Sequence, residues 1–425
     1  MTVAGIPLDF ILFALTLLGV AVFHHHTLYV ALAGMVTIAL YKILFSDFAG
    51  VPGVQGLAAL LGHEWVTLGN LLGLLLGFAL LADHFERSEF TDLLPNHLPD
   101  DWKGGFVLLL IIFVLSSFLD NIAAAMIGGA MAHVLYRGRV HIGYLAAIVA
   151  ASNAGGAGSV VGDTTTTMMW IAGVLPTQVF EAYVGALVAV LFFGVIAARQ
   201  QHAFQPIMKD NPKEFRLDYG RLAVVAIVLL TAIATNVYFN LKHPEMLGEL
   251  PLIGIAVWAA LLATAGWRKP TWSLLPGAFR GSVFLLSLVM CAAMMPVKAL
   301  PEASWGTTLG LGFVSAVFDN IPLTALALRQ GGYDWGFVAY AVGFGGSMIW
   351  FGSSAGVALS NMYPQARSVG AWLRSGWHVA VGYVLGFAVL MALVGWNPEE
   401  HAGSKRSAAS VESPSAVPSL PHTKP

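Results

Sequence analysis

Three aspartates stand inside hydrophobic segments of this chain, at Asp120, Asp163 and Asp319. No Lys or Arg lies near them in the sequence, because the basic residues occur at the ends of those segments. An ionised carboxylate inside a membrane costs several kcal/mol unless it has a partner. Burial favours the neutral form of a carboxyl group, so such a group binds a proton or stays ionised beside a cation. A site that accepts either ion, but not both, is the central requirement of cation/proton antiport.

Neutral oxygen atoms accompany these aspartates. The amide oxygens belong to Asn121, Asn153 and Asn320, and the hydroxyl groups to Ser159, Thr164, Thr165, Thr166, Thr167, Ser353 and Ser354. We expect the helices to unwind at Gly155-Gly156 and Gly345-Gly346, which frees backbone carbonyls as hard ligands for a small cation such as Na⁺. Because 164–167 covers one helical turn, some of the four threonines must bond back to the preceding turn.

Structural interpretations compete with these assignments. A buried Asp also serves as a hydrogen-bond hub, and glycines in membrane helices are often only packing contacts. Packing explains Gly73 and Gly77, which have GxxxG spacing, as well as a site would. Asn70 is interpreted as structural. Packing is also the expected role of Met168, Met169 and Trp170.

The composition identifies the elements that must position these residues. Of 425 residues, 57% are hydrophobic and only 10% are charged, whereas a soluble protein carries about 25% charged residues. The chain is therefore a polytopic, all-α membrane protein whose main partner is the bilayer. A net charge of −2 implies no strongly charged partner such as nucleic acid. The single cysteine, Cys291, excludes an intramolecular disulfide, and the first apolar segment is expected to be retained.

Apolar stretches divide the chain into spans of roughly 20 residues, with several shorter or interrupted segments. Before the polar linker at 199–221, we expect spans at 8–23, 27–45, 64–81 and 178–198, loops at 46–63 and 83–103, a re-entrant hairpin at 104–135 and a broken helix at 142–174. After it, we expect spans at 222–239, 251–267, 281–297 and 373–396, a hairpin at 304–329 and a broken helix at 335–362. The Ser- and Pro-rich end, 397–425, is expected to be a disordered tail.

The two halves, 1–198 and 222–396, repeat one plan. FVLSSFLDNIAAA aligns with FVSAVFDNIPLTA, and GGAGSVVGDT aligns with GGSMIWFGSS, so that Asp163 corresponds to Ser353. If the 199–221 linker is cytoplasmic, fourteen Lys and Arg residues fall inside and, apart from the tail, four fall outside, at Lys42, Lys242, Lys298 and Arg329. This bias satisfies the positive-inside rule and predicts inverted repeats with both termini outside. Each repeat then has three spans, a hairpin, a broken helix and a final span.

At these residues the sequence resembles the ion transporter superfamily. Within it, SNAGGAGSVVGDTTTTMMW resembles the N-A-G-G…S…G-D-x-T-T-x-M-W pattern of NhaD-type sodium/proton antiporters, and LDNI and FDNIPLTA resemble their two Asp-Asn segments. The resemblance implies ion-pathway roles for Asp120, Asn121, Asn153, Asp163, Thr165, Thr166, Ser315, Asp319, Asn320, Ser353 and Ser354. It also implies an elevator-type or rocking motion and raises the expectation of a homodimer. Ala123 and Ala124 depart from the family, in which threonines follow the first Asp-Asn.

We expect a secondary transporter that exchanges Na⁺ or Li⁺ for H⁺ by alternating access in a bacterial cytoplasmic membrane. It needs no cofactor, and Na⁺ is expected at Asp120, Asn153, Asp163 and Asp319. The alternative is a Na⁺-coupled carrier of a carboxylate or an arsenite-like anion. Three buried acids without a core Arg or Lys argue against an anion as the main substrate. An enzyme lacks support from any nucleophile–base or metal-ligand arrangement, and a channel remains a third reading.

Overall fold

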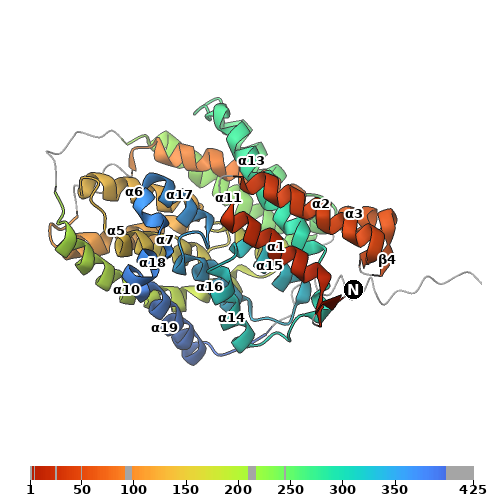
Figure 1. Ribbon diagram of the computed structural model, residues 1–425. Helices are drawn as coiled ribbons and strands as arrows, with labels where there is room; N and C mark the ends of the chain where they lie inside the picture. Colours follow the sequence, from red (N-terminus) through yellow and green to blue (C-terminus); the bar gives the residue numbers. More distant parts are fainter. Residues whose placement is uncertain are drawn as a thin grey trace, which may run out of the picture.

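The computed structural model describes residues 2–3, 5–23, 26–48, 50–90, 98–208, 217–243 and 246–398 and is mainly helical (Figure 1). Two short hairpins are its strands, β1 Thr2–Val3 with β2 Ile6–Pro7 and β3 Asp47–Phe48 with β4 Val51–Pro52. The expected tail lies outside the described residues except for 397 and 398. The mainly helical structure agrees with the all-α membrane architecture predicted from the composition.

The helices follow the order of the expected spans. Before the 199–221 segment they are α1 Leu8–Val22, α2 Thr27–Phe45, α3 Gly53–Glu86, α5 Trp102–Ser116, α6 Asn121–Leu135, α7 Ile142–Ala157, α8 Thr164–Ile171, α9 Pro176–Phe180 and α10 Ala182–Phe204. After it they are α11 Tyr219–Lys242, η2 Met246–Gly248, α12 Leu252–Thr264, η3 Trp272–Leu274, α13 Leu275–Ala293, η4 Val297–Ala299, α14 Trp305–Ser315, α15 Asn320–Gln330, α16 Trp335–Gly345, η5 Gly346–Met348, α17 Ser354–Met362, η6 Pro364–Arg367, α18 Val369–Ser375 and α19 Trp377–Leu393.

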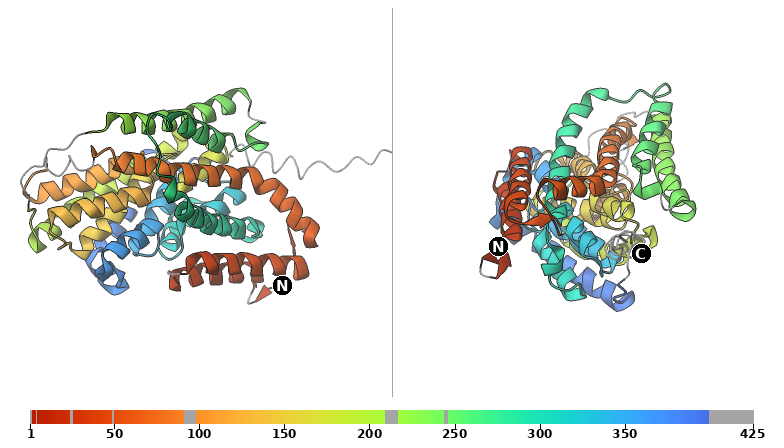
Figure 2. Two further views of the ribbon diagram at one scale, coloured as in Figure 1. Left: turned by 90° about the horizontal axis from the view of Figure 1, so that it is seen from above. Right: turned by 90° about the vertical axis from the view of Figure 1, so that its right-hand side faces the viewer.

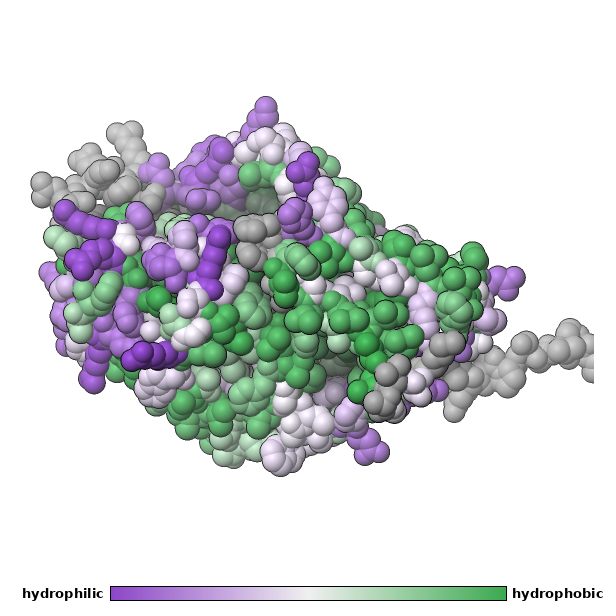
Figure 3. All heavy atoms as spheres, viewed as in Figure 1, coloured by the Kyte–Doolittle hydropathy of each residue, from purple (hydrophilic) through white to green (hydrophobic). Residues whose placement is uncertain are grey.

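Among the described residues, five helical stretches are long and apolar enough to cross a membrane, and α18 with α19 makes a sixth if this pair, bent by 58°, counts as one span. Apolar side chains cover the middle and right of the face shown in Figure 3, and hydrophilic residues gather at its left end. A continuous apolar surface of this kind suits lipid rather than water. The chain is an integral membrane protein.

The predicted loop at 46–63 is wrong beyond residue 52, because α3 already begins at Gly53 and runs for 34 residues. Gly50, with a positive φ angle of 94°, lies in the turn of the β3–β4 hairpin, and Gly53, with a φ angle of 68°, follows β4 as the first residue of α3. The glycine that follows, Gly56, is helical and packs against the carbonyl group of Val51. Glycines in this stretch thus serve both a turn and a close contact, which composition alone does not separate.

The polar linker at 199–221 is also shorter than predicted. Its first residues extend α10 to Phe204, and α11 begins at Tyr219. Residues 209–216 lie outside the described residues. Charged side chains at the ends of these helices are compatible with helix, because Lys, Arg and Gln have high helix propensities.

The helices pack as two groups, and the first of them is built around two fully buried helices, α7 and α16. Every residue of α7 from Gly143 to Ala157 is buried, and so is every residue of α16. Helices α5, α10 and α19 surround them, whereas α3 packs against α11, α12 and α13, as the long orange helix beside the green pair in Figure 2 shows. The groups meet where α13 packs against α15 and α3 against α8.

Candidate ion-binding site

Each hairpin breaks at an Asp-Asn pair that starts its second helix. Asp120 precedes α6 with φ −53° and ψ 141°, and Asp319 precedes α15 with φ −54° and ψ 141°. The two tips therefore have nearly the same backbone conformation. Both predicted hairpin breaks are confirmed, since α5 ends at Ser116 and α14 at Ser315.

The broken helices repeat this pattern at Asp163 and Ser353. Both residues are extended, with φ −144° and −140°, and both cap the following helix through a side-chain oxygen, which accepts from the backbone N–H of Thr165 or of Gly356. N-cap residues with a short oxygen-bearing side chain satisfy one of the free amide groups of a helix N-terminus. The aligned pair thus has the same local role in the two halves.

The prediction that the helix unwinds at Gly155-Gly156 is wrong. The helix is interrupted between Gly158 and Asp163 instead. Gly155 and Gly156 are the last turn of α7. Gly345 ends α16, and Gly346 begins the 3₁₀ helix η5. The carbonyl oxygen of Gly155 accepts a hydrogen bond of 3.1 Å from the Ser117 hydroxyl group.

Glycines in and beside the broken helices instead allow each hairpin to pack closely against a broken helix. At four of them, an added Cβ atom would overlap with a backbone carbonyl group of the neighbouring hairpin arm, so no larger residue fits without movement. The four pairs are Gly155 with Phe113, Gly162 with Ser116, Gly345 with Gly312 and Gly352 with Ala316. The packing interpretation of membrane glycines applies at these positions, in both halves. It applies equally to Gly73, which lies against Gly254, and Asn70 is structural because its Oδ1 accepts from the N–H of Gly254 at 3.0 Å.

Asp163 lies where the two halves meet. Its Oδ1 accepts from Asn121 Nδ2 at 3.4 Å, and its Oδ2 accepts from Asn320 Nδ2 at 3.4 Å, so each hairpin tip contributes one amide group. Thr165 donates to the same carboxylate through its hydroxyl group at 2.7 Å and its N–H at 3.4 Å. The Asp163 side chain is buried, with 3% exposed. The α16 backbone at Gly343 also approaches it closely, since an added Cβ would lie 3.3 Å from Oδ2.

Asn153 joins the same network across the repeat. Its Oδ1 accepts from Asn121 Nδ2 at 3.0 Å, and its Nδ2 donates to the hydroxyl groups of Ser347 at 3.0 Å and Ser353 at 3.1 Å. Sequence reasoning missed Ser347 and Gly343. The signal available for Ser347 was a hydroxyl residue beside the Gly345-Gly346 pair in the broken helix.

The four threonines divide as the helical turn requires. Among their hydroxyl groups, only that of Thr165 donates to the Asp163 carboxylate in the described structure. Thr166 and Thr167 donate to the backbone carbonyl of Asp163, both at 2.9 Å, and also to carbonyls of the unwound segment. The prediction that some of them bond to the preceding turn is confirmed, and these two hold the segment before α8 in place.

The other two aspartates have different surroundings. Asp120 lines a cavity of about 200 Å³ with Asp163, Thr164 and Thr167, and residues of α3 and α13 also line it. The Asp319 carboxylate accepts from the N–H of Ile321 at 3.0 Å and the Ser354 hydroxyl group at 3.1 Å. Ser315 donates to the carbonyl of Val342 at 2.8 Å, which fixes the second hairpin to α16.

Helix N-termini compensate the buried negative charge. The carboxylates of Asp120, Asp163 and Asp319 precede α6, α8 and α15, and the positive end of a helix dipole stabilises an anion there. Among the described residues, no group of three or more His, Cys, Asp and Glu side chains is placed to hold a metal ion.

Several curated proteins similar to this chain are named sodium/proton antiporters. No family model matches the chain. It is 28% identical over 361 residues to the Na(+)/H(+) antiporter NhaD of Vibrio parahaemolyticus, covering 71% of this chain and 84% of that protein. It is 26% identical to sodium/proton antiporter 1 of Arabidopsis thaliana over 74% of this chain, a match that spans only 60% of that longer relative. NhaD of Alkalimonas amylolytica is 26% identical, over 68% of each chain. The chain thus resembles NhaD-type sodium/proton antiporters, which are transporters rather than enzymes.

Proposed function

We propose that this protein is a secondary active transporter that exchanges Na⁺ or Li⁺ for H⁺. The observation that carries the proposal is the buried Asp163 carboxylate, which both hairpin tips contact and which lines a cavity. The names of the relatives support the same exchange. A bacterial cytoplasmic membrane and a homodimer are part of the proposal by resemblance alone.

The cation site we propose consists of Asp163, the hydroxyl group of Thr165 and amide oxygens of Asn121 and Asn320. Both amides now donate to Asp163 through Nδ2. Rotating an amide group by half a turn exchanges its NH₂ for its oxygen without moving the backbone. We propose that arrival of Na⁺ drives this rotation, because oxygen atoms are the ligands that a hard cation prefers.

Proton binding at Asp163 would use the same atoms. A protonated carboxyl group has lost its charge and presents a donor, so it no longer attracts Na⁺. Release of the proton restores the attraction. Competition for one carboxylate thus couples the two ions without a second site, and it predicts that apparent Na⁺ affinity weakens as the pH falls.

Alternating access would follow from the repeated plan. The tips at Asp120 and Asp319 share one backbone conformation, and the glycine–carbonyl contacts occur in both halves. These likenesses support the inverted repeats that the motif alignment and the charge bias predict. The group containing α7 and α16 would then move against α3 and α13, which line the cavity beside Asp163.

The alternative is a Na⁺-coupled anion carrier. The helix N-termini that meet at the site also favour an anionic substrate. Asp163 and Asp319, however, already cap α8 and α15 through side-chain oxygens, and Asp120 places a third carboxylate at the start of α6. Cation exchange is therefore the better-supported function.

The deciding experiment uses purified protein in liposomes with a pH-sensitive dye inside. Addition of Na⁺ or Li⁺ is expected to change the internal pH in a saturable way, and K⁺ is expected to have little effect. Asp47→Asn is a matched control, because Asp47 is exposed and Asn retains the oxygen that accepts from Gly50 N–H at 2.7 Å. A pH change that requires a dicarboxylate together with Na⁺ would replace antiport with the anion carrier.

A further inference from the structure

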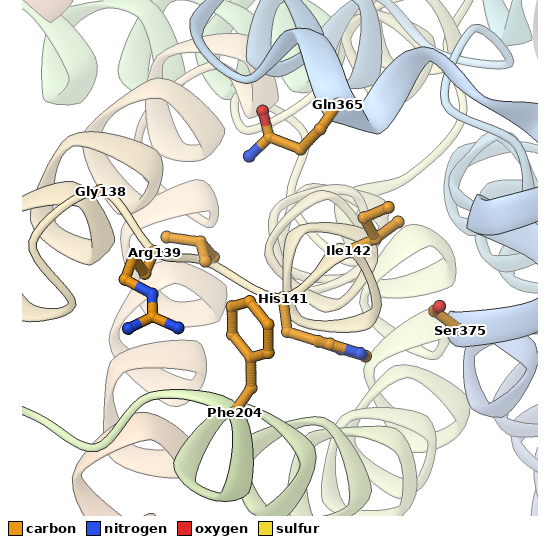
Figure 4. Close-up of a pocket in the computed structure, with 8 residues that line it drawn as sticks. Gly138, Arg139, His141, Ile142, Phe204, Gln365 and Ser375 are labelled. Atoms are coloured by element: carbon orange, nitrogen blue, oxygen red, sulfur yellow. The ribbon is translucent and has the colours of Figure 1, made fainter.

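A second cavity, of about 370 Å³, lies away from Asp163 beside the loop that joins α6 to α7. Figure 4 shows Arg139 and His141 of this loop, Phe204 at the end of α10 below them, Gln365 of η6 at the top and Ser375, the last residue of α18, at the right. The cavity therefore lies between the two halves of the chain. The cation site does not use any of its residues.

Its lining carries hydrogen-bond donors and positive charge. None of the eight described residues that line it is acidic. The Arg139 guanidinium lies 5.6 Å from the centre of the Phe204 ring, a stacking contact that leaves its N–H groups free to donate. His141 Nδ1 accepts from the N–H of Gly143 at 3.2 Å, so Nε2 carries the proton of the neutral ring and is a donor. Gln365 and Ser375 add an amide and a hydroxyl group.

The loop is held in this shape by one buried side chain, Gln201 of α10. Its Oε1 accepts from the N–H of His141 at 2.7 Å, and its Nε2 donates to the carbonyl of Arg139 at 3.2 Å. Gln201 is completely buried. The positions of Arg139 and His141 are thus set before any ligand binds, which reduces the entropy that binding costs.

We propose that this cavity binds a phosphate-type anion, supplied either by the headgroup of an anionic lipid or by free phosphate. Arg forms two parallel hydrogen bonds with phosphate oxygens, and His, Gln and Ser complete the oxygen shell. The N-terminus of the 16-residue helix α7, which begins at the cavity with Ile142, adds a favourable dipole. Basic pockets between membrane helices are suited to lipid headgroups.

Binding here would stabilise the contact between the two halves. The same α7 carries Asn153, and Trp372 of α18 donates to the carbonyl of Ser347, a partner of Asn153, at 3.3 Å. The anion would thus hold together elements that also build the cation site. The inference does not depend on Na⁺/H⁺ exchange, because its test measures binding and stability.

The test uses purified full-length protein in two arms. In the first, inorganic phosphate is titrated into detergent-solubilised protein at constant ionic strength in chloride. In the second, the thermal unfolding midpoint is compared in nanodiscs of phosphatidylglycerol and of phosphatidylcholine. The variants are Arg139→Gln and His141→Asn, the latter keeping an acceptor for the Gly143 N–H. Arg280→Gln is the control, since Arg280 is exposed on α13 and does not line the cavity.

We expect saturable phosphate binding that weakens by about tenfold or more in both variants, the effect of losing one charged hydrogen bond, and stays unchanged in Arg280→Gln. Stabilisation by phosphatidylglycerol alone, lost in the same two variants, identifies the lipid as the source of the anion and supports the proposal equally. The proposal fails if neither anion acts, or if all three variants lose the effect alike. Size-exclusion profiles separate a loss of binding from a loss of folding.

Discussion

Glu64 of α3 and Arg329 of α15 form an ion pair with a distance of 2.7 Å between Oε1 and Nη1, although 265 residues separate them. Glu64 lies seven residues before Leu71, where α3 begins to line the Asp163 cavity, which is about 10 Å along the helix. Both side chains are largely buried, with 13% and 27% exposed. The pair thus joins α3 to α15 at a point on α3 that precedes the cavity-lining residues.

Breaking this pair removes a contact between α3 and α15 and should thereby loosen the packing of α15 against the neighbouring helix α13. For a partly exposed pair we expect a cost of about 1 kcal/mol, which changes an opening equilibrium roughly fivefold. The single cysteine, Cys291 of α13, reports on it, because its thiol is fully buried in the core that α13 shares with α15. Glu64→Gln should therefore speed maleimide labelling of Cys291 by about fivefold.

The charge-reversed double variant, Glu64→Arg with Arg329→Glu, is the control for that experiment. It restores the attraction, so labelling should return toward the slow rate of the unmodified protein. Equal labelling rates in the single variant and the unmodified protein would show that the pair does not hold the two groups together.

Close packing, rather than unwinding, makes Gly155 necessary. Gly155→Ala places a methyl group against the carbonyl of Phe113, and overpacking of this kind costs about 1–3 kcal/mol. We expect a lower thermal unfolding midpoint and displacement of the first hairpin. Gly310→Ala is the matched control, because an added Cβ there meets nothing within 4 Å. It should be neutral or stabilising, as Ala exceeds Gly in helix propensity; an equally stable Gly155→Ala would contradict the packing role.

The hairpins and broken helices could be predicted because each carries polar residues in the middle of an apolar stretch too short for two spans. The position of the break near Gly158 could not, since glycine marks both unwinding and close approach, and only the neighbouring carbonyl of Phe113 decides between them. The start of α3 at Gly53 was hidden for the same reason.

The site was only partly predictable. Asp163 and the Asp-Asn tips stand out because a membrane segment rarely carries an acid. The contacts between the two halves could not be predicted. Asn153 and Ser353, for example, are 200 residues apart, and a local sequence pattern does not indicate a contact over that separation. Ser347 was missed because a single serine among buried apolar residues also satisfies itself by bonding to its own helix.

Asp120 and Asp319 should differ in their influence on cation binding, although they align in the repeat. Asp120 lines the cavity beside Asp163, so Asp120→Asn removes a charge that attracts the entering cation. We expect apparent Na⁺ affinity to weaken by roughly tenfold, the equivalent of about 1.4 kcal/mol. In Asp319→Asn, the amide oxygen still accepts from the N–H of Ile321, so a change below about threefold is expected.

Titration of Na⁺ against antiport rate at several pH values measures both effects. The affinity of the unmodified protein should fall with decreasing pH, and Asp120→Asn should shift the whole curve. An equal loss of affinity in the two variants would mean that the two tips contribute alike, against the asymmetry of their contacts.

Asp163 is the residue on which the proposed exchange depends. Asp163→Asn keeps the side-chain shape, and the hydroxyl group of Thr165 is free to reverse its hydrogen bond toward the new NH₂ group. The variant should therefore fold and insert in the membrane, yet lose Na⁺-dependent proton flux because neither ion finds a charge to bind. Asp163→Glu retains the charge and should keep weak activity despite its extra methylene group.

A purely structural role predicts the reverse order of these variants. The Asn side chain would then be tolerated, because its oxygen still accepts from Asn121, while reversal of the Thr165 hydroxyl group and rotation of the Asn320 amide restore the other two contacts. The longer Glu side chain would disrupt these contacts. Antiport rates in liposomes, compared at equal amounts of folded protein, distinguish the two orders. A fully active Asp163→Asn variant would end the assignment of this carboxylate as the ion-binding group, whatever the result for Glu.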